Sequence, residues 1–200
     1  LEHDKSTYGI SVFARDITEQ KLALESIHQL AYFDALTALP NRRLLLDRLR
    51  QEVSFSDRRG TYSALLFIDL DNFKVLNDTR GHQVGDELLV EVAHRLRKSV
   101  RESDTVARLG GDEFVILTCD IGKTIDEAIG HIEVVGLKVL NSLRDEFMVG
   151  QESYRTTASI GAYPFNSEVT SVEELLKRAD TAMYQAKGSG RNALCFFDPK

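Results

Sequence analysis

The stretch Thr105-Val-Ala-Arg-Leu109, Gly110-Gly111-Asp112-Glu113, Phe114-Val-Ile-Leu-Thr118 joins two apolar runs through two glycines and two acids. The runs are typical of short strands, and Gly-Gly supplies the positive φ angles of a tight hairpin turn. The hairpin then holds two carboxylates side by side at its tip. Because neighbouring carboxylates repel each other unless a cation lies between them, the arrangement indicates a metal site. An ordinary polar hairpin is the alternative for these residues taken alone.

The composition limits the class of protein. The chain has 200 residues, 42% of them hydrophobic, which is enough for one domain with a buried core plus an appendage. Its net charge of −6 argues against a general nucleic-acid binder but not against a site for a single nucleotide. Cys119 and Cys195 lie in apolar strand-like runs, which predicts reduced core residues without a disulfide. No apolar stretch approaches a membrane span and no signal peptide opens the chain, so we expect a cytoplasmic fragment of a soluble or membrane-attached parent.

Apolar periodicity and capping residues predict the other elements. Strands are expected over 9–14, 62–69, 155–163 and 193–197, and helices after Asp16, over 42 to about 54, 73–78, 84–100, 125–143 and 172 to about 187. Asn41 is expected to cap one helix, and Ser171 with Glu174 forms a capping box for another. The apolar stripe between Leu22 and Phe33 predicts either a short coiled-coil seam or a face packed on the domain.

From Tyr62 onward the predicted order is β-α-β-β-α-β followed by α-β, which matches the ferredoxin-like split βαβ pattern. In that topology the first and third strands are antiparallel neighbours in the centre of the sheet. Asp69 ends the first strand, and Asp112 and Glu113 begin the third. Three carboxylates from distant positions should therefore converge at one edge of the sheet, which strengthens the metal prediction.

The run Phe67-Ile-Asp-Leu-Asp-Asn-Phe-Lys-Val-Leu-Asn-Asp78 carries a second set of polar residues. Asp69 and Asp71 alternate along a strand and can share a face. The backbone N–H groups of residues 72–74 then open a helix and form a potential phosphate cradle. The alternative is a strand–turn–helix in which the aspartates cap the helix.

Asn77 and Asp86 follow, with Gly81-His82 and Gly85 between them. A carboxylate accepts from both N1–H and N2–H of guanine, and adenine has no such donor pair, so an Asp with an Asn is a suitable guanine reader. The alternative is that the two side chains cap adjoining helices and the glycines serve only as turn residues.

With these segments together, the chain resembles a GGDEF domain of the diguanylate cyclase family over about Asp34 to Phe197. The resemblance rests on several separate motifs in the right order: Asp34-Ala-Leu-Thr-Ala-Leu-Pro-Asn-Arg42, Asp69-Leu-Asp-Asn-Phe-Lys74, Asn77-Asp78, Gly81-His82, Gly85-Asp86, Gly110-Gly-Asp-Glu-Phe114 and Tyr184-Gln-Ala-Lys-Gly-Ser-Gly-Arg-Asn192. Three positions depart from the family pattern, namely Ala38 for glycine and Arg80 and Leu109 for aromatic residues; none is a metal or guanine ligand.

The resemblance implies an α+β fold: a ferredoxin-like βαββαβ palm of nucleotidyl-cyclase type with an added helix and strand, preceded by an N-terminal signalling helix. Residues 1–33 are then the end of a PAS-like sensor domain with that helix, because Ala14-Arg-Asp-Ile-Thr-Glu-Gln-Lys21 resembles such a junction. Residues 34–200 form the GGDEF domain. Phe196-Phe-Asp-Pro199 resembles the point where such domains continue into an EAL phosphodiesterase domain.

The resemblance also implies the chemistry of the family, which condenses two GTP molecules into cyclic di-GMP and two pyrophosphates. By similarity, Asp69, the backbone carbonyl of Leu70, Asp112 and Glu113 hold Mg²⁺, with Mn²⁺ as the alternative ion. Asp112 and Glu113 are the catalytic pair, and Asp112 is the candidate general base. Residues matching the phosphate turn, the guanine readers and the phosphate-gripping cations bind substrate: Phe73, Lys74, Asn77, Asp86, Lys187 and Arg191. For Lys187, interaction with the dipole of its own helix is the alternative.

Closing a ring of two nucleotides requires two domains facing each other, so the resemblance implies a head-to-head homodimer with GTP as substrate and cyclic di-GMP as product. Neither a nucleic-acid polymer nor a membrane is expected as a partner of this fragment.

Arg101-Glu-Ser-Asp104 matches the inhibitory product site of the family, where an arginine reads guanine O6 and N7. For Arg101 and Asp104, a solvated surface ion pair is the alternative.

A second hypothesis for the domain is a catalytically silent GTP- or cyclic di-GMP-binding module that regulates an attached phosphodiesterase. A third is a scaffold domain, which would leave the acids unexplained.

Overall fold

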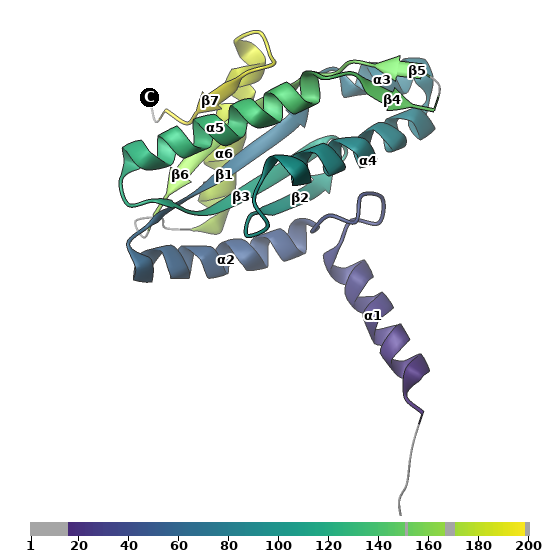
Figure 1. The fold of residues 1–200 in the computed structure, drawn as a ribbon, viewed down its shortest axis with the longest axis horizontal. Helices are drawn as coiled ribbons and strands as arrows, with labels where there is room; N and C mark the ends of the chain where they lie inside the picture. The colour runs from purple at the N-terminus through teal and green to yellow at the C-terminus, as the bar shows by residue number, and fades with distance from the viewer. Residues whose placement is uncertain (1–15, 151, 167–170, 199–200) are drawn as a thin grey trace, which may run out of the picture.

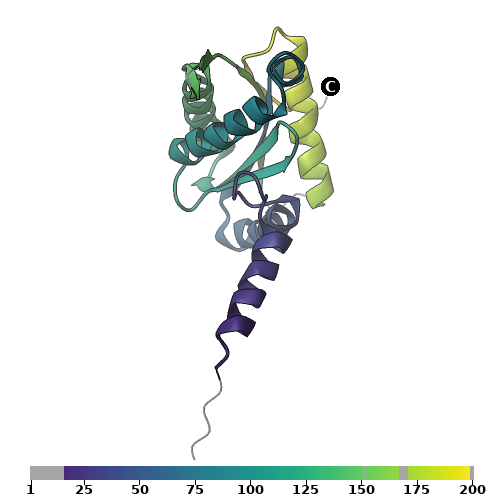
Figure 2. The same cartoon turned by 90° about the vertical axis from the view of Figure 1, so that its right-hand side faces the viewer.

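The computed structural model describes residues 16–150, 152–166 and 171–198. Its centre is a five-stranded sheet in the order β2-β3-β1-β6-β7, with helices on both faces (Figures 1 and 2). The strands are β1 Tyr62–Leu70, β2 Thr105–Gly110, β3 Glu113–Gly122, β6 Ala158–Phe165 and β7 Leu194–Phe196, with β4 Phe147–Val149 and β5 Glu152–Tyr154 in a separate hairpin. The helices are α1 Thr18–Tyr32, α2 Arg42–Arg59, α3 Phe73–Arg80, α4 His82–Ser99, α5 Ile125–Arg144 and α6 Val172–Gly188.

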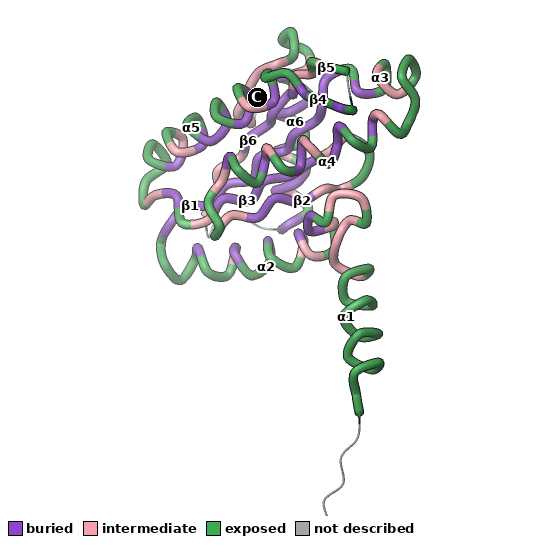
Figure 3. Tube along the Cα trace, turned by 45° about the vertical axis from the view of Figure 1, so that its right-hand side comes forward, coloured by how far each residue is buried: buried purple, intermediate pink, exposed green. Residues whose placement is uncertain are grey.

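Strand β1 is the central strand of the sheet and is buried on both faces (Figure 3). Its even-numbered residues Ala64, Leu66 and Ile68 pack with the apolar faces of α4 and α5. Its odd-numbered residues Leu65 and Phe67 pack with α2 and α6 on the opposite face. Successive side chains of a strand point to opposite faces, which is why a continuous apolar run is needed where helices cover both sides.

The predicted α+β topology is confirmed. β1 runs antiparallel to β3 on one side and to β6 on the other, as the split βαβ pattern requires. β7 extends the sheet by pairing parallel with β6, so α6 and β7 are the added helix and strand. The predicted strand over 9–14 lies outside the described residues.

The capping predictions hold in large part. Asn41 accepts hydrogen bonds from the backbone N–H groups of Arg43 (3.0 Å) and Leu44 (3.2 Å), as expected of an N-cap. The helix then continues to Arg59, beyond the predicted end near 54, and stops at Gly60 in the left-handed conformation. Ser171 caps α6 through the N–H of Glu174.

Two local predictions were wrong. The carboxylate of Glu174 accepts from Arg178 one turn further along α6, and a complete capping box occurs instead at Thr124 and Glu127, where α5 begins. The strand predicted over 155–163 begins three residues later, because the preceding chain forms the β4–β5 hairpin and then crosses to the sheet.

Helix α1 extends away from the rest of the domain (Figure 2). None of its residues is buried, and Leu22, Leu24, Ile27 and Leu30 are all more than half exposed. The apolar stripe therefore does not pack on the domain, and that alternative is wrong for the described part of the chain. Within that same part, no helix has the length and apolar character needed to cross a bilayer.

Gly161 on β6 allows α6 to lie directly against the sheet. A Cβ at this position would lie 2.0 Å from the backbone nitrogen of Met183 and 2.1 Å from the carbonyl oxygen of Ala179. Both atoms belong to the backbone of α6 and cannot rotate aside. The glycine thus sets the distance between β6 and the helix that carries Lys187 at its end.

We expect Gly161→Ala to lower the free energy of unfolding by about 3 kcal/mol, because the added methyl forces α6 off the sheet. Gly130→Ala is the matched control: this exposed α5 glycine has no atom within 4 Å of an added Cβ, and alanine there should raise stability by about 0.5–1 kcal/mol. Urea denaturation measures both. Equal stability of the two variants would contradict the close packing of α6.

Candidate functional site

The acids predicted to converge do meet at one end of the central strands. Asp69 and Glu113 are directly opposed partners in the antiparallel pairing of β1 with β3. Asp112 lies in the turn before β3, and its carbonyl oxygen accepts a hydrogen bond from the Leu70 N–H at 3.4 Å. Gly110 and Gly111 both have positive φ angles, 145° and 52°, which few other residues adopt without strain. The glycine pair therefore makes the turn that brings Asp112 beside the end of β1.

Lys187 supplies a positive charge to this cluster. Its Nζ lies 2.8 Å from Asp69 Oδ1, with the Asp69 side chain only 10% exposed. Lys187 is also the basic residue in the last turn of α6. The sequence left two roles open for Lys187, phosphate binding and interaction with the dipole of its own helix. The two roles are compatible, because its ammonium group lies both at the end of α6 and beside the acids.

The acids of the site repel one another. Burial raises the pKa of the Asp69 carboxyl, and the charges of Asp112 and Asp71 act in the same direction against the Lys187 ammonium. Burial also raises the pKa of Glu113, together with the charges of Asp69, Asp180 and Asp112. Because each carboxylate disfavours ionisation of its neighbour, a cation bound among them would be stabilised by all of them.

The donor set fits Mg²⁺ in its chemistry. Mg²⁺ takes oxygen ligands and is usually held by one or two carboxylates together with substrate phosphates, and Asp69, Asp112, Glu113 and the carbonyl of Leu70 provide only oxygen. In the described part of the chain, no three acidic, histidine or cysteine side chains already stand close enough to hold an ion. Lys187 is bonded to Asp69 here, so an incoming ion would share or take over that carboxylate.

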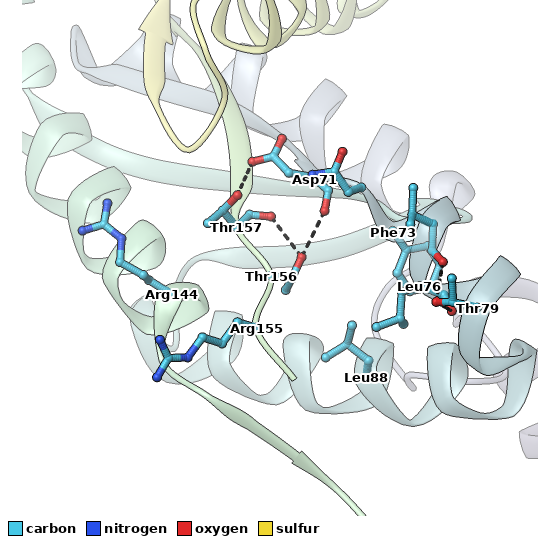
Figure 4. A pocket seen from close by; sticks show the side chains of 11 residues that line it. Asp71, Phe73, Leu76, Thr79, Leu88, Arg144, Arg155, Thr156 and Thr157 are labelled. Atoms are coloured by element: carbon cyan, nitrogen blue, oxygen red, sulfur yellow. Dashed lines mark hydrogen bonds between the residues drawn. The ribbon is translucent and has the colours of Figure 1, made fainter. Parts of the chain in front are cut away.

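Asp71 has a different environment from Asp69. Its carboxylate accepts hydrogen bonds from the hydroxyls of Thr157 (2.6 Å) and Ser159 (2.7 Å), and from the backbone N–H of Asn192 (3.1 Å). Figure 4 shows the Thr157 contact at a cavity of about 480 Å³ that Asp71, Phe73 and Thr157 all line. These bonds tie the end of β1 to β6 and to the loop after α6. Asp71 is thus a structural link between the segments that carry the site.

The predicted phosphate-binding residues lie in the segments that follow β1 and α6. Asn72 adopts the left-handed conformation (φ 59°), and α3 begins immediately after it with a buried Phe73 and an exposed Lys74. The first N–H groups of a helix lack intrahelical acceptors and can bind an anion. Arg191 also has a left-handed backbone (φ 66°), in the loop between α6 and β7.

The predicted guanine readers lie on two consecutive helices. Asn77 is on α3, and its Oδ1 is buried and has no hydrogen-bond partner among the described residues. Gly85 on α4 lies against it, because a Cβ there would come within 1.9 Å of Asn77 Oδ1. Asp86, the next residue, is exposed. A buried oxygen without a donor is unfavourable by about 1–3 kcal/mol, which favours an external donor at Asn77.

Arg101 and Asp104 close a short turn between α4 and β2. Asp104 Oδ2 accepts from the backbone N–H of Arg101 at 3.0 Å, and the Asp104 N–H donates to the Arg101 carbonyl at 3.1 Å. The carboxylate thus bonds the main chain of Arg101 rather than its guanidinium. Both residues line a cavity of about 520 Å³ together with His131 and Lys138 on α5. This arrangement differs from the simple surface ion pair that was the alternative.

Three residues beside the hairpin, Arg108, Asp34 and Asp180, were assigned no role from the sequence. Arg108 donates to the Gly111 carbonyl and pairs with Asp34, and Asp180 on α6 adds to the negative charge at Glu113. Asp34 opens one of the quoted motifs, so its presence there was the available signal. Arg108 lies in a strand pattern, where one arginine is expected to face solvent, and no neighbouring residue in the sequence indicates its partners.

Comparison with known proteins gives a single family. Residues 31–193 match the family model described as diguanylate cyclase, GGDEF domain. The bifunctional diguanylate cyclase/cyclic di-GMP phosphodiesterase MucR of Pseudomonas aeruginosa is 44% identical over 170 residues, covering 85% of this chain and 24% of MucR. The cyclic di-GMP phosphodiesterase PdeR of Escherichia coli is 34% identical, covering 92% of this chain and 27% of PdeR.

Solved structures agree with the fold. The coiled coil and GGDEF domain of DgcB from Caulobacter crescentus, crystallised in complex with c-di-GMP, superposes with a TM-score of 0.75 at 27% identity, covering 90% of this chain and 93% of that one. The chain spans about a quarter of the length of the two curated relatives above.

Proposed function

The chain belongs to the GGDEF family of diguanylate cyclase domains, and on that premise we propose that it condenses two GTP molecules into cyclic di-GMP and two pyrophosphates. The observation that carries the proposal is the cross-strand pair of Asp69 and Glu113 beside the Gly110-Gly111 turn. A buried Asp69 and a half-buried Glu113 that repel each other at the end of the central strands have no structural purpose that apolar residues would not serve better.

In the proposed site, Asp69, the carbonyl of Leu70, Asp112 and Glu113 would hold Mg²⁺. The ion, when bound, neutralises phosphate charge and lowers the pKa of the ribose 3′-hydroxyl. Asp112 accepts the proton of that hydroxyl; the 3′ oxygen then bonds to the α-phosphorus of the facing GTP, and the bond to pyrophosphate breaks. Lys187 exchanges its contact with Asp69 for the terminal phosphates, which Arg191 and the amides at Phe73 and Lys74 also contact.

The guanine base is proposed to lie between α3 and α4. There the unpaired Oδ1 of Asn77 and the carboxylate of Asp86 accept its N–H groups, which adenine cannot supply in the same pattern. Two such half-sites must face each other to close the ring. We propose that the exposed apolar stripe of α1 pairs with that of a second copy and brings the two domains together.

Arg101 and Asp104 are proposed as the inhibitory product site. The guanidinium of Arg101 is exposed and is not engaged by Asp104, whose carboxylate bonds the main chain. It is therefore available to donate to guanine O6 and N7 of cyclic di-GMP. Product bound there on two copies at once would hold them in an arrangement that cannot react.

The second candidate is a silent nucleotide-binding module that regulates an attached phosphodiesterase. It is favoured by the similarity to PdeR, a protein named for phosphodiesterase activity. This chain retains Asp69, Asp112 and Glu113 together, however, and a purely regulatory module has no need of that cluster.

We expect the chain, incubated with GTP and Mg²⁺ at high protein concentration, to form cyclic di-GMP. Asp69→Asn should lower turnover by about 10²–10³-fold, because it removes a charge that acts in the transition state. Asp57→Asn, on an exposed α2 residue, should leave turnover unchanged. Chromatography of the products measures all three. A wild-type chain that binds GTP but forms no cyclic dinucleotide would favour the regulatory module instead.

We expect Gly85→Ala to weaken GTP binding by about tenfold, since the new methyl displaces Asn77 Oδ1 and the lost hydrogen bond is worth about 1–1.5 kcal/mol. Binding of ATP should change little, so discrimination between the two nucleotides falls. Asp86→Ala should reduce the same ratio, and Gly130→Ala serves as the control. Calorimetric titration with each nucleotide measures it. Unchanged discrimination in both site variants would remove this guanine assignment.

We expect Arg101→Ala to weaken binding of cyclic di-GMP by about tenfold or more, because a bidentate arginine–guanine contact is worth about 1–3 kcal/mol. Arg144→Ala, on an exposed arginine at the end of α5, is the control. Calorimetry of the product with each variant is the measurement. Wild-type affinity in Arg101→Ala would place the inhibitory site elsewhere.

A further inference from the structure

Arg108 on β2 connects two parts of the chain that the proposed function does not link. Its Nε and Nη2 donate to the carbonyl oxygen of Gly111 at 3.0 and 2.8 Å, and its Nη1 donates to Asp34 Oδ1 at 2.9 Å. The Arg108 side chain is only 10% exposed. A guanidinium carries its donors in a rigid planar fork, so one arginine can hold both partners in a fixed mutual geometry.

The Gly111 contact acts on the hairpin turn. The carbonyl of Gly111 belongs to the planar peptide unit that continues into Asp112, so holding its oxygen orients the start of the Asp112 residue. Gly111 itself has φ 52° and no side chain to pack, and glycine is the residue with the most backbone freedom. The turn therefore depends on outside contacts for its precision, and Arg108 provides two hydrogen bonds to it.

The Asp34 contact acts on the turn that follows α1. Asp34 Oδ1 also accepts from the backbone N–H and the hydroxyl of Thr37, at 2.9 and 2.6 Å. Although burial acts to raise it, the pKa of Asp34 is lowered by these bonds and by the Arg108 guanidinium. The turn is closed by bonds between Asp34 N and Leu39 O (2.8 Å) and between Ala38 N and Asp34 O (2.9 Å).

The main chain of Arg108 binds the same segment. Its N–H donates to the carbonyl of Pro40 at 3.0 Å, so backbone and side chain of one residue both hold the 34–40 turn. Ala38 in this turn has φ 54°, a left-handed conformation that is strained for alanine. A strained turn persists only where surrounding contacts over-determine it, and the bonds to Arg108 are among those contacts.

We propose that Arg108 is a positioning residue for the metal-binding acids: its guanidinium, fixed by the Asp34 carboxylate, holds the Gly111 carbonyl so that Asp112 and Glu113 are presented toward Asp69. The inference rests on the proposed function for the identity of the ligand. The same arginine joins the turn after α1 to the hairpin, so the turn and the acids are held in one fixed geometry.

The test uses Mn²⁺ binding to the 200-residue chain without nucleotide, measured by electron paramagnetic resonance. Arg108→Gln should weaken Mn²⁺ binding by about tenfold or more, the usual effect of removing a group that orients a metal ligand. Arg108→Lys should weaken it to a similar degree, because a single ammonium cannot reach Gly111 twice and Asp34 as well. Recovery of wild-type affinity with lysine would show that only the charge matters and would overturn the proposal.

Arg95 provides the matched control. It is a similarly buried arginine (16% exposed) that pairs with Glu91 and donates to the backbone carbonyls of Ser142, Asp145 and Glu146, away from the hairpin. Arg95→Gln should lower thermal stability yet leave Mn²⁺ affinity unchanged. If Arg95→Gln weakens Mn²⁺ binding as much as Arg108→Gln, the effect is general destabilisation and the positioning role is wrong.

Amide hydrogen exchange gives a second readout. In Arg108→Gln the amides of Asp112 and Glu113 should exchange faster, whereas those in the middle of β3 should keep their protection. Uniformly faster exchange along β3, or no change at the turn, would overturn the proposal.

Turnover separates this proposal from the cyclase assignment. If the wild-type chain forms no cyclic di-GMP but Arg108→Gln selectively weakens Mn²⁺ binding, the positioning role holds and the cyclase assignment fails. If the wild-type chain forms cyclic di-GMP and Arg108→Gln keeps both the wild-type kcat and the wild-type Mn²⁺ affinity, the cyclase assignment holds and the positioning role fails. Absence of Mn²⁺ binding in the wild-type chain overturns the positioning proposal.

Discussion

The register between β1 and β3 is the constraint on which the site depends, because it sets Asp69 opposite Glu113. Opposed residues of an antiparallel pair have Cβ atoms about 4.5–5.5 Å apart, so two carboxylates there repel each other in every rotamer. The apolar side chains hold the register: Val115 and Leu117 of β3 pack on the same side as Leu65 and Phe67 of β1. A slip of one residue would send all of them to the wrong face.

This pairing explains why the site is unfavourable for the domain without a cation. Burial and mutual repulsion raise the pKa of both Asp69 and Glu113, and Lys187 offsets the charge of only one of them directly. Asp71 shows the contrast, since three donors within the fold satisfy its buried carboxylate. Asp71 is thus bonded entirely within the fold, whereas Asp69 has the Lys187 ammonium as its partner and is the acid that we propose binds the ion.

The features that were predicted correctly from the sequence are those that follow from regular residue patterns. Alternation and continuous apolar runs indicated the strands, and the split βαβ order was enough to bring Asp69 to Glu113. Prediction from the sequence failed where the hydrogen-bond partner of a residue is distant along the chain and no motif identifies it. The hydroxyls that bind Asp71 come from Thr157 and Ser159, which read as ordinary strand residues, and the short β4–β5 hairpin lacks a strong turn signal. The direction of α1 also lay beyond the sequence, because an amphipathic stripe is the same whether it packs on its own domain or on a second copy.

The position of the 34–40 turn bears on how such a domain is controlled. The turn lies between an unpacked α1 and a hairpin that carries two of the acids. Arg108 holds it at both ends, through the Asp34 carboxylate and the Pro40 carbonyl. If α1 pairs two copies, its orientation sets how the two half-sites face each other, since the turn is too firmly held to absorb a rotation. Control would then act on the arrangement of whole domains, while each half-site keeps its own geometry. A loose linker at this point would uncouple the paired helices from the sites, whereas the left-handed backbone at Ala38 belongs to a turn that surrounding contacts hold in place.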